Sequence, residues 1–559
     1  MTIEAVRRRL SAGETAADIA RAALARIAQW DDPALFIAVR EEAALLAEAA
    51  ALPPGPLHGV PFVVKDNIDA AGLPTTAACP DHGYFPAEDA PVVARLRAAG
   101  ALLLGKVNLD QFATGLNGTR SPHGTPRNAV DATLIPGGSS SGSASAVAAG
   151  IAAFSLGTDT AGSGRVPAAA QGLVGLKPSL GLVPTRGVVP ACRSLDCVSV
   201  FAHTVADASA VLAVIAGPDA RDPYSRAAPP HWRAVEPAPP RFRLAVPLDA
   251  QLELDDRAGF DATVARAEAL GGTLHRVDIA PFLDVARRLY DGAWVAERTA
   301  ALRGRVTQRP ETLHPVTRKI LEGGLHRLAV DAFDDFHAAA EARLLARRLF
   351  AGADALLLPT CPGVPTLAAM LADPIGANSR LGRYTNFVNL CDLAALAVPV
   401  GAGVTLVGPA FSEARLAGLG AALLGEALPE APLAADEIAL FCIGAHMSGL
   451  PLNHQVLGHG GRFLRAASTA PEYRLFDLGT RPGLLHAAQG GGAIAGEVWS
   501  LPAASIGPFL ASIPPPLGFG RIALDDGESV LGFLAEAEGV AQAPEITASG
   551  GWRAHLAAR

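Results

Sequence analysis

The sequence predicts an α/β protein that carries a second, smaller β-rich domain. Over the first 430 residues, helix-forming stretches alternate with short apolar runs, which indicates helices layered on a sheet. Beyond residue 438, strand-like segments replace that alternation. The chain has 559 residues, which is too long for one ordinary core. We therefore expect one domain over residues 1–430 and a second, α+β domain rich in strands over residues 438–559.

The expected helices follow from apolar periodicity and from N-terminal caps. Thr15 and Asp18 have the spacing of a capping box, and the apolar residues after them return to one helix face. Further helices are expected over 92–99, 144–151, 261–270 and 341–350. The stretch 144–151 directly follows a turn rich in glycine and serine, so this turn opens a helix.

Short apolar runs predict the strands. In the first domain they are 60–65, 101–104, 243–246 and 355–358. In the second domain they are 473–478, 496–501, 521–524 and 530–534, with a turn at 525–527. Residues 393–411 are also apolar, but their prolines and glycines predict buried strands joined by a turn and not a membrane span. Residues 428–435, which hold two prolines, predict a linker.

Composition narrows the class of function. The net charge of −8 and the lack of a basic run argue against a nucleic-acid partner. The six cysteines show no C-x-x-C pair and no His-Cys ligand spacing, so we expect no metal site and no cofactor. Such cysteines are typical of small buried apolar residues in a reducing cytoplasm. The first residues show no targeting pattern, because no apolar region follows their arginines.

Two glycine-dense turns and one lysine contain the candidate catalytic residues. Ser139 and Ser163 lie 24 residues apart, and Lys65 ends the apolar run 60–65. A serine hydroxyl needs a base to take its proton, and no histidine lies in either turn. A buried lysine can serve once its pKa falls by roughly three units from about 10.4. The glycines around Ser163 allow backbone N–H groups to converge as an oxyanion hole.

Each of these elements also has a simpler interpretation. A segment rich in glycine and serine is commonly a flexible linker. A lysine after an apolar strand is commonly a solvated strand end. The occurrence of all three elements in order favours the catalytic interpretation.

At these residues the chain resembles the amidase signature family, which uses a Ser-cisSer-Lys triad. The resemblance implies that Ser163 is the nucleophile, Ser139 the relay after a cis peptide, and Lys65 the base. It also implies a mixed, twisted sheet covered by helices on both faces. The oxyanion hole would use the N–H groups of Thr160, Ala161, Gly162 and Ser163. Two departures from the family pattern, Ala161 and Ser141, keep small residues.

Substrate choice must come from residues outside the triad. Tyr290 and Arg298 are eight residues apart, a spacing that places both on one face of a continuous helix. An arginine in the pocket would bind a carboxylate through two parallel hydrogen bonds. The alternative is that Arg298 is a solvated helix residue.

The segment 109–116, the Tyr290 and Arg298 pair and the extra C-terminal domain together resemble the allophanate hydrolase branch of the family. The resemblance implies that Tyr290 and Arg298 hold the carboxylate end of the substrate and that Gly115 also contacts it. Ser163 would attack the terminal carboxamide, release ammonia and leave N-carboxycarbamate after hydrolysis.

The C-terminal domain resembles the γ-glutamyl-cyclotransferase-like domain of allophanate hydrolases, which is associated with decarboxylation of that intermediate. His446 lies in a glycine-rich turn, and Asn453 and Glu497 are its candidate partners for a dianionic ligand. The alternative is that His446 only satisfies backbone groups in the turn.

Other functions remain open on the sequence alone. One is a different amidase of the family, acting on an aliphatic or aryl amide, or the amide-hydrolysing component of a tRNA-dependent amidotransferase. Another is a scaffold without catalysis, against which the three triad residues argue. We expect a cytoplasmic homodimer that acts on a small molecule in urea or triazine breakdown, with no nucleic-acid or membrane partner.

Overall fold

The computed structural model of the chain describes residues 1–428, 433–487 and 489–559, which form two compact units. The first unit comprises Met1–Ala234, Leu244–Ala269 and Leu274–Ala427. The second comprises Leu428–Arg559 together with two inner segments, Val235–Arg243 and Leu270–Thr273. No sequence pattern predicts that these inner segments belong to the second unit. Residues 429–432 of the predicted linker lie outside the described part of the chain.

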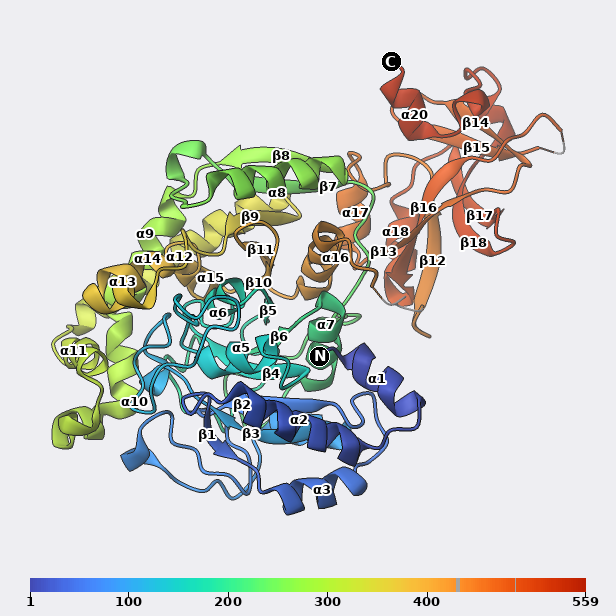
Figure 1. Cartoon of the computed structure of the whole chain (residues 1–559). Coiled ribbons are helices and arrows are strands. Elements are labelled where there is room, and N and C mark those ends of the chain that lie inside the picture. The colour runs from blue at the N-terminus through green and yellow to red at the C-terminus, as the bar shows by residue number, and fades with distance from the viewer. Residues whose placement is uncertain (429–432, 488) are drawn as a thin grey trace. The chain divides into compact units, whose positions relative to one another are not determined.

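An 11-stranded mixed sheet runs through the first unit (Figure 1). In spatial order its strands are β1 (Phe36–Val39), β3 (Leu102–Val107), β2 (Pro61–Lys65), β4 (Phe154–Asp159), β6 (Cys197–Ala202), β5 (Val174–Lys177), β10 (Leu393–Val398), β11 (Val404–Pro409), β9 (Ala355–Pro359), β7 (Phe242–Pro247) and β8 (Gly272–Val277). Strand β2 pairs in parallel with β3 and β4, whereas β4 pairs with β6 in the antiparallel direction. The central strands are buried throughout, which matches their continuous apolar runs.

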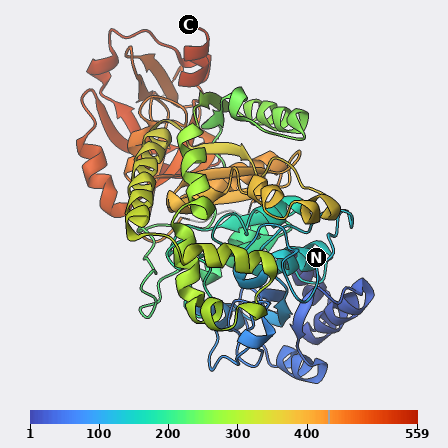
Figure 2. The same ribbon diagram turned by 90° about the vertical axis from the view of Figure 1, so that its left-hand side faces the viewer.

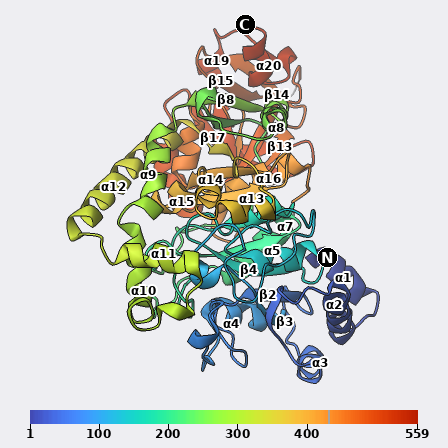
Figure 3. The ribbon, with the colours of Figure 1, turned by 60° about the vertical axis from the view of Figure 1, so that its left-hand side comes forward.

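Helices cover both faces of this sheet. They are α1 (Ile3–Ser11), α2 (Ala16–Trp30), α3 (Glu42–Ala50), α4 (Pro91–Ala98), α5 (Ser141–Ala148), α6 (Val166–Ala170), α7 (Val205–Ile215), α8 (Arg257–Ala269), α9 (Ala280–Asp291), α10 (Trp294–Gln308), α11 (Pro315–Gly324), α12 (Ala329–Gly352), α13 (Leu367–Ala372), α14 (Gly376–Leu381), α15 (Asn386–Leu390) and α16 (Glu413–Leu424). The predicted capping box of Thr15 and Asp18 forms at the start of α2. Helices α9 to α12 lie together at one side of the unit (Figures 2 and 3).

The apolar stretch 393–411 forms strands, as predicted. Strands β10 and β11 pair as an antiparallel hairpin from Leu393 opposite Pro409 to Val398 opposite Val404. Within the described residues, no helix combines the length and the apolar character needed to cross a membrane.

The second unit holds two small sheets and short helices. Its five-stranded sheet has the order β13 (Arg462–Ser468), β16 (Ala495–Pro502), β12 (Glu437–Cys442), β18 (Ser529–Ala535) and β17 (Leu517–Ala523), and β14 (Tyr473–Asp477) pairs with β15 (Pro482–His486). Its helices are α17 (Asn453–Gly458), α18 (Ala503–Ala511), α19 (Ala537–Val540) and α20 (Trp552–Ala557). Strands β17 and β18 pair across the predicted turn at 525–527. A separate apolar core, which includes Trp499 and Trp552, stabilises this unit.

Candidate active site

Lys65 is the last residue of β2, and its side chain is fully buried. Its Nζ lies 2.7 Å from both Ser139 Oγ and Thr158 Oγ1 and donates to them. The peptide bond between Gly138 and Ser139 is cis, as the family resemblance implied. The structure thus brings together two predicted residues and adds Thr158, which lies in the Gly-Thr-Asp-Thr segment but was not singled out from the sequence.

Burial lowers the pKa of Lys65 to about 7, although Asp110, Asp196 and Asp159 act in the opposite direction. Only the neutral amine can accept a proton. We therefore expect kcat/KM to rise from about pH 6 to about pH 8 as Lys65 loses its charge. A pH–rate profile measures this rise, and a flat profile over that range would contradict a base with this pKa.

Ser163 lies in the turn between β4 and α6, and its Oγ donates to the Gly115 carbonyl over 3.5 Å. The loop that carries Gly115 wraps around the Asp110 carboxylate, which accepts from the N–H groups of Asn117, Gly118 and Arg120. A Cβ at position 115 would lie 2.5 Å from Asp110 Oδ2, so only glycine fits there. The predicted Gly115 therefore lies beside the predicted nucleophile.

The predicted oxyanion hole needs one correction. The Gly162 N–H donates to Asp159 Oδ1 over 2.9 Å, so it is already engaged. The N–H groups of Thr160, Ala161 and Ser163 donate to no acceptor within the described residues. Three of the four predicted donors are thus available for a developing negative charge.

A buried ion pair fixes the turn that holds Ser163. Arg165 Nε and Nη2 donate to the two oxygens of Asp159, each over 2.9 Å. Burial would raise the pKa of Asp159, but Arg165 lowers it below its usual value. Asn389 on α15 donates to the Asp159 carbonyl and accepts from Arg165. No local sequence pattern marks this network, although Asp159 and Arg165 flank the turn that carries Ser163.

Asp196 is a further buried carboxylate that was not predicted. It accepts from the Thr160 hydroxyl and from the N–H groups of Ala191 and Cys192. Burial raises the pKa of Asp196 to about 6. Because Thr160 also carries one of the available N–H groups, Asp196 helps to hold the orientation of that donor.

Tyr290 and Arg298 meet in the structure, but not on one helix. Helix α9 ends at Asp291 and α10 begins at Trp294, so the prediction of one continuous helix face is wrong. The break at Gly292 allows the Arg298 guanidinium to lie over the Tyr290 ring, with Cζ 5.1 Å from the ring centroid. Arg298 Nη2 also donates to the Tyr290 hydroxyl over 3.4 Å. Arg298 also donates to the Ala113 carbonyl and to Thr114 Oγ1, in the two residues before Gly115.

Arg298 is 1% exposed, so the alternative of a solvated helix residue is wrong. Within the described residues it forms no ion pair, and its Nε has no hydrogen-bond partner. A buried guanidinium is costly without an anion beside it. This arrangement suits a ligand that brings its own carboxylate.

In the second unit His446 lines a cavity of about 270 Å³ with Gln455 and Arg481. Its ring stacks on Phe533, its Nε2 lies 3.0 Å from Gln455 Oε1, and burial lowers its pKa. Asn453 donates to the His446 carbonyl and so supports the turn.

Glu497 has a supporting position in the same unit. It accepts from Ser448, Trp499 and Arg553 and is not among the residues that line the cavity. Of the three candidates predicted for this unit, His446 is therefore the one that faces the cavity.

A large mixed sheet that carries a buried lysine, two serines and unengaged N–H groups is typical of an amide hydrolase. Residues 18–417 match the amidase family, and residues 438–557 match the allophanate hydrolase C-terminal domain. The chain therefore belongs to the amidase family, with an allophanate hydrolase C-terminal domain as its second unit.

Solved and curated proteins agree with this assignment. Allophanate hydrolase of Kluyveromyces lactis is 37% identical with a TM-score of 0.80, and the match covers 100% of this chain and 99% of that one. Urea amidolyase of Saccharomyces cerevisiae is 40% identical over 90% of this chain, which spans about 30% of the length of that relative. A glutamyl-tRNA(Gln) amidotransferase chain of Symbiobacterium thermophilum is 38% identical, over 72% of this chain and 92% of that relative.

Proposed function

We propose that this chain is an allophanate hydrolase that cleaves the terminal carboxamide of allophanate to ammonia and N-carboxycarbamate. The observation that carries the proposal is Arg298, a buried guanidinium without an ion pair in the described residues, next to the loop whose Gly115 carbonyl contacts Ser163. Allophanate supplies the missing anion at one end and a cleavable carboxamide at the other. Relatives named allophanate hydrolase and urea amidolyase support this choice.

In this mechanism neutral Lys65 withdraws a proton from Ser139, which in turn takes the proton of Ser163. Ser163 Oγ forms a bond to the carboxamide carbon, and the carbonyl oxygen gains negative charge. The N–H groups of Thr160, Ala161 and Ser163 stabilise that charge. Ser139 returns the proton to the leaving nitrogen, which departs as ammonia. Water then hydrolyses the acyl-enzyme by the same relay and frees Ser163.

Ammonia release from allophanate, malonamate and a simple aryl amide, compared side by side, tests the substrate. We expect allophanate to have the highest kcat/KM and malonamate, which also carries a carboxylate, to exceed the aryl amide. A preference for the aryl amide would instead support a general amidase. Dependence on a partner chain and on tRNA would support an amidotransferase component, the function named for one group of relatives.

We also propose that the second unit promotes decarboxylation of N-carboxycarbamate, with His446 as the group that positions or protonates it. Its place in the wall of a cavity and its contact with Gln455 support this role. Since segments 235–243 and 270–273 belong to the second unit, a substitution in the full chain is a cleaner test than truncation.

His446→Ala is expected to leave the release of the first ammonia unchanged and to lengthen the lifetime of N-carboxycarbamate. Carbon-13 NMR of the products of labelled allophanate measures both quantities. His454→Ala, which removes an exposed histidine nearby, is the matched control. Equal lifetimes in the wild type and in both variants would leave the second unit with a structural role only.

We further propose a cytoplasmic homodimer. All six cysteines are buried and free, which supports a reducing compartment. Val330, Phe333 and Phe336 recur every three residues along α12 and are 63%, 64% and 54% exposed, which supports contact with a second copy. Sedimentation velocity of the intact chain checks this, and a monomer at micromolar concentration would refute it.

A further inference from the structure

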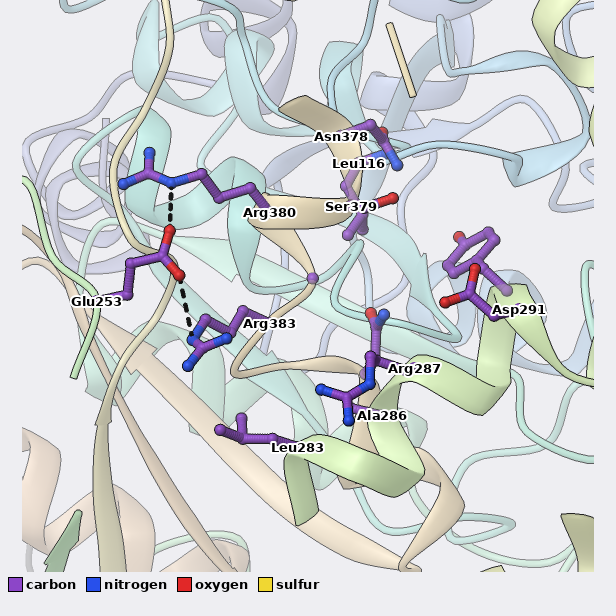
Figure 4. Close-up of a pocket in the computed structure, with 13 residues that line it drawn as sticks. Leu116, Glu253, Leu283, Ala286, Arg287, Asp291, Asn378, Ser379, Arg380 and Arg383 are labelled. Atoms are coloured by element: carbon purple, nitrogen blue, oxygen red, sulfur yellow. Dashed lines mark hydrogen bonds and ion pairs between the residues drawn. The ribbon is translucent and has the colours of Figure 1, made fainter. Parts of the chain in front are cut away.

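Asn378 of α14 lines a cavity of about 330 Å³ together with Tyr290 and Leu116. Its side chain is 5% exposed. Figure 4 shows Asn378 beside Leu116, across the cavity from Leu283 and Arg287 of α9. A buried amide is costly unless its polar atoms have partners, so the contacts of each atom matter.

The orientation of this amide is fixed by two donors. Asn378 Oδ1 accepts from the Leu116 N–H and from Asn117 Nδ2, each over 2.8 Å. Because both neighbours donate, the atom that faces them must be the carbonyl oxygen. The opposite atom, Nδ2, donates to no group among the residues that the structure describes. Its N–H groups are thus left to serve a ligand in the cavity.

These contacts also connect Asn378 to the loop beside Ser163, the proposed nucleophile. Leu116, which Asn378 holds by its N–H, directly follows Gly115, whose carbonyl lies 3.5 Å from Ser163 Oγ. Leu116 itself lines the cavity, so the cavity wall begins one residue from the Gly115 carbonyl that contacts Ser163. The far end of a small linear substrate with its carboxamide at Ser163 can extend in this direction.

We propose that Asn378 is a specificity-determining residue that donates through Nδ2 to the carboxylate of the substrate. This inference rests on the proposed hydrolysis of an amide with a carboxylate at its far end. Arg298 supplies the positive charge for that carboxylate, Tyr290 contributes a hydroxyl, and Asn378 adds a directional donor. A hydrogen bond to a charged group is stronger than one to a neutral group, so Asn378 favours a carboxylate over a carboxamide.

Binding of allophanate and of biuret to the Ser163→Ala protein provides the test, because biuret replaces the carboxylate of allophanate by a carboxamide. Asn378→Asp keeps the acceptor for Leu116 and Asn117 but presents a second oxygen where Nδ2 stood. Isothermal titration calorimetry at pH 8 is expected to show allophanate binding weakened by about 100-fold or more. Biuret, whose NH₂ can donate to the new oxygen, is expected to keep its affinity within a few-fold.

Asn378→Ala is the second variant, and it is expected to weaken allophanate more than biuret because a charge-assisted hydrogen bond is lost. Gln308→Glu, at an exposed position of α10, controls for the added negative charge and should change neither affinity. Equal weakening of both ligands in folded Asn378 variants, or no weakening of either, would overturn the inference. A Ser163→Ala protein that binds biuret but not allophanate would instead refute the proposed function.

Discussion

Ser163→Ala is expected to abolish ammonia release from allophanate, with a loss in kcat of at least about 10⁴-fold. The reason is that Ser163 Oγ contacts the Gly115 carbonyl and belongs to the turn whose N–H groups are unengaged among the described residues. A coupled assay of ammonia measures the loss. Ser209→Ala, which removes a buried hydroxyl without a hydrogen-bond partner on α7, is the matched control and should retain activity.

Lys65→Ala and Ser139→Ala belong to the same prediction, since these residues form the relay. Each is expected to lower kcat by about 10²- to 10⁴-fold, the usual contribution of a positioned acid or base. Lys319→Ala on the exposed face of α11 controls for the loss of a lysine. A Lys65→Ala protein that kept near-wild-type kcat at neutral pH would show that the mechanism is wrong.

Arg298→Ala is expected to weaken allophanate binding by about 2 to 5 kcal/mol, the range for the loss of one partner of a buried charge pair. Because about 1.4 kcal/mol corresponds to tenfold, kcat/KM should fall by about 30-fold or more. Tyr290→Phe should weaken allophanate binding less, since it removes one hydroxyl and keeps the ring over which the Arg298 guanidinium lies. Steady-state kinetics with allophanate and with a neutral aryl amide separate the loss of carboxylate binding from a general defect.

Arg303→Ala lies on the same helix at an exposed position and serves as the control for Arg298→Ala. It should leave kcat/KM for allophanate unchanged. If Arg298→Ala behaved like this control, the argument for a carboxylate-bearing substrate would be lost and the general amidase would be favoured.

Much of the fold was predictable because its signals are local. The capping box of α2 and the hairpin of β10 and β11 each depend on a few consecutive residues. The assignment of Lys65 to the end of a buried strand rests on the apolar run before it. Such features need no knowledge of distant segments.

Contacts across hundreds of residues were not predictable in this way. Asn389 reaches the Asp159 carbonyl from 230 positions away, and Asn378 reaches Leu116 from 262 positions away. An asparagine has no local pattern that marks it as part of a site. The break between α9 and α10 was also missed, because the eight-residue spacing of Tyr290 and Arg298 fits one long helix equally well.

The sequence by itself predicted the alternation of helices and strands in the first domain, the strand-rich second domain and the candidate residues Lys65, Ser139 and Ser163, because turn chemistry and apolar periodicity are properties of neighbouring residues. Only the tertiary structure decided the chemical state of the site. The pKa of Lys65 falls to about 7 because remote segments enclose it and remove water. The surrounding segments also bury Arg298 without giving it an ion pair in the described residues. The Gly162 N–H is engaged because it donates to Asp159. Desolvation and donor geometry depend on what surrounds a group in space, and sequence neighbours do not specify that.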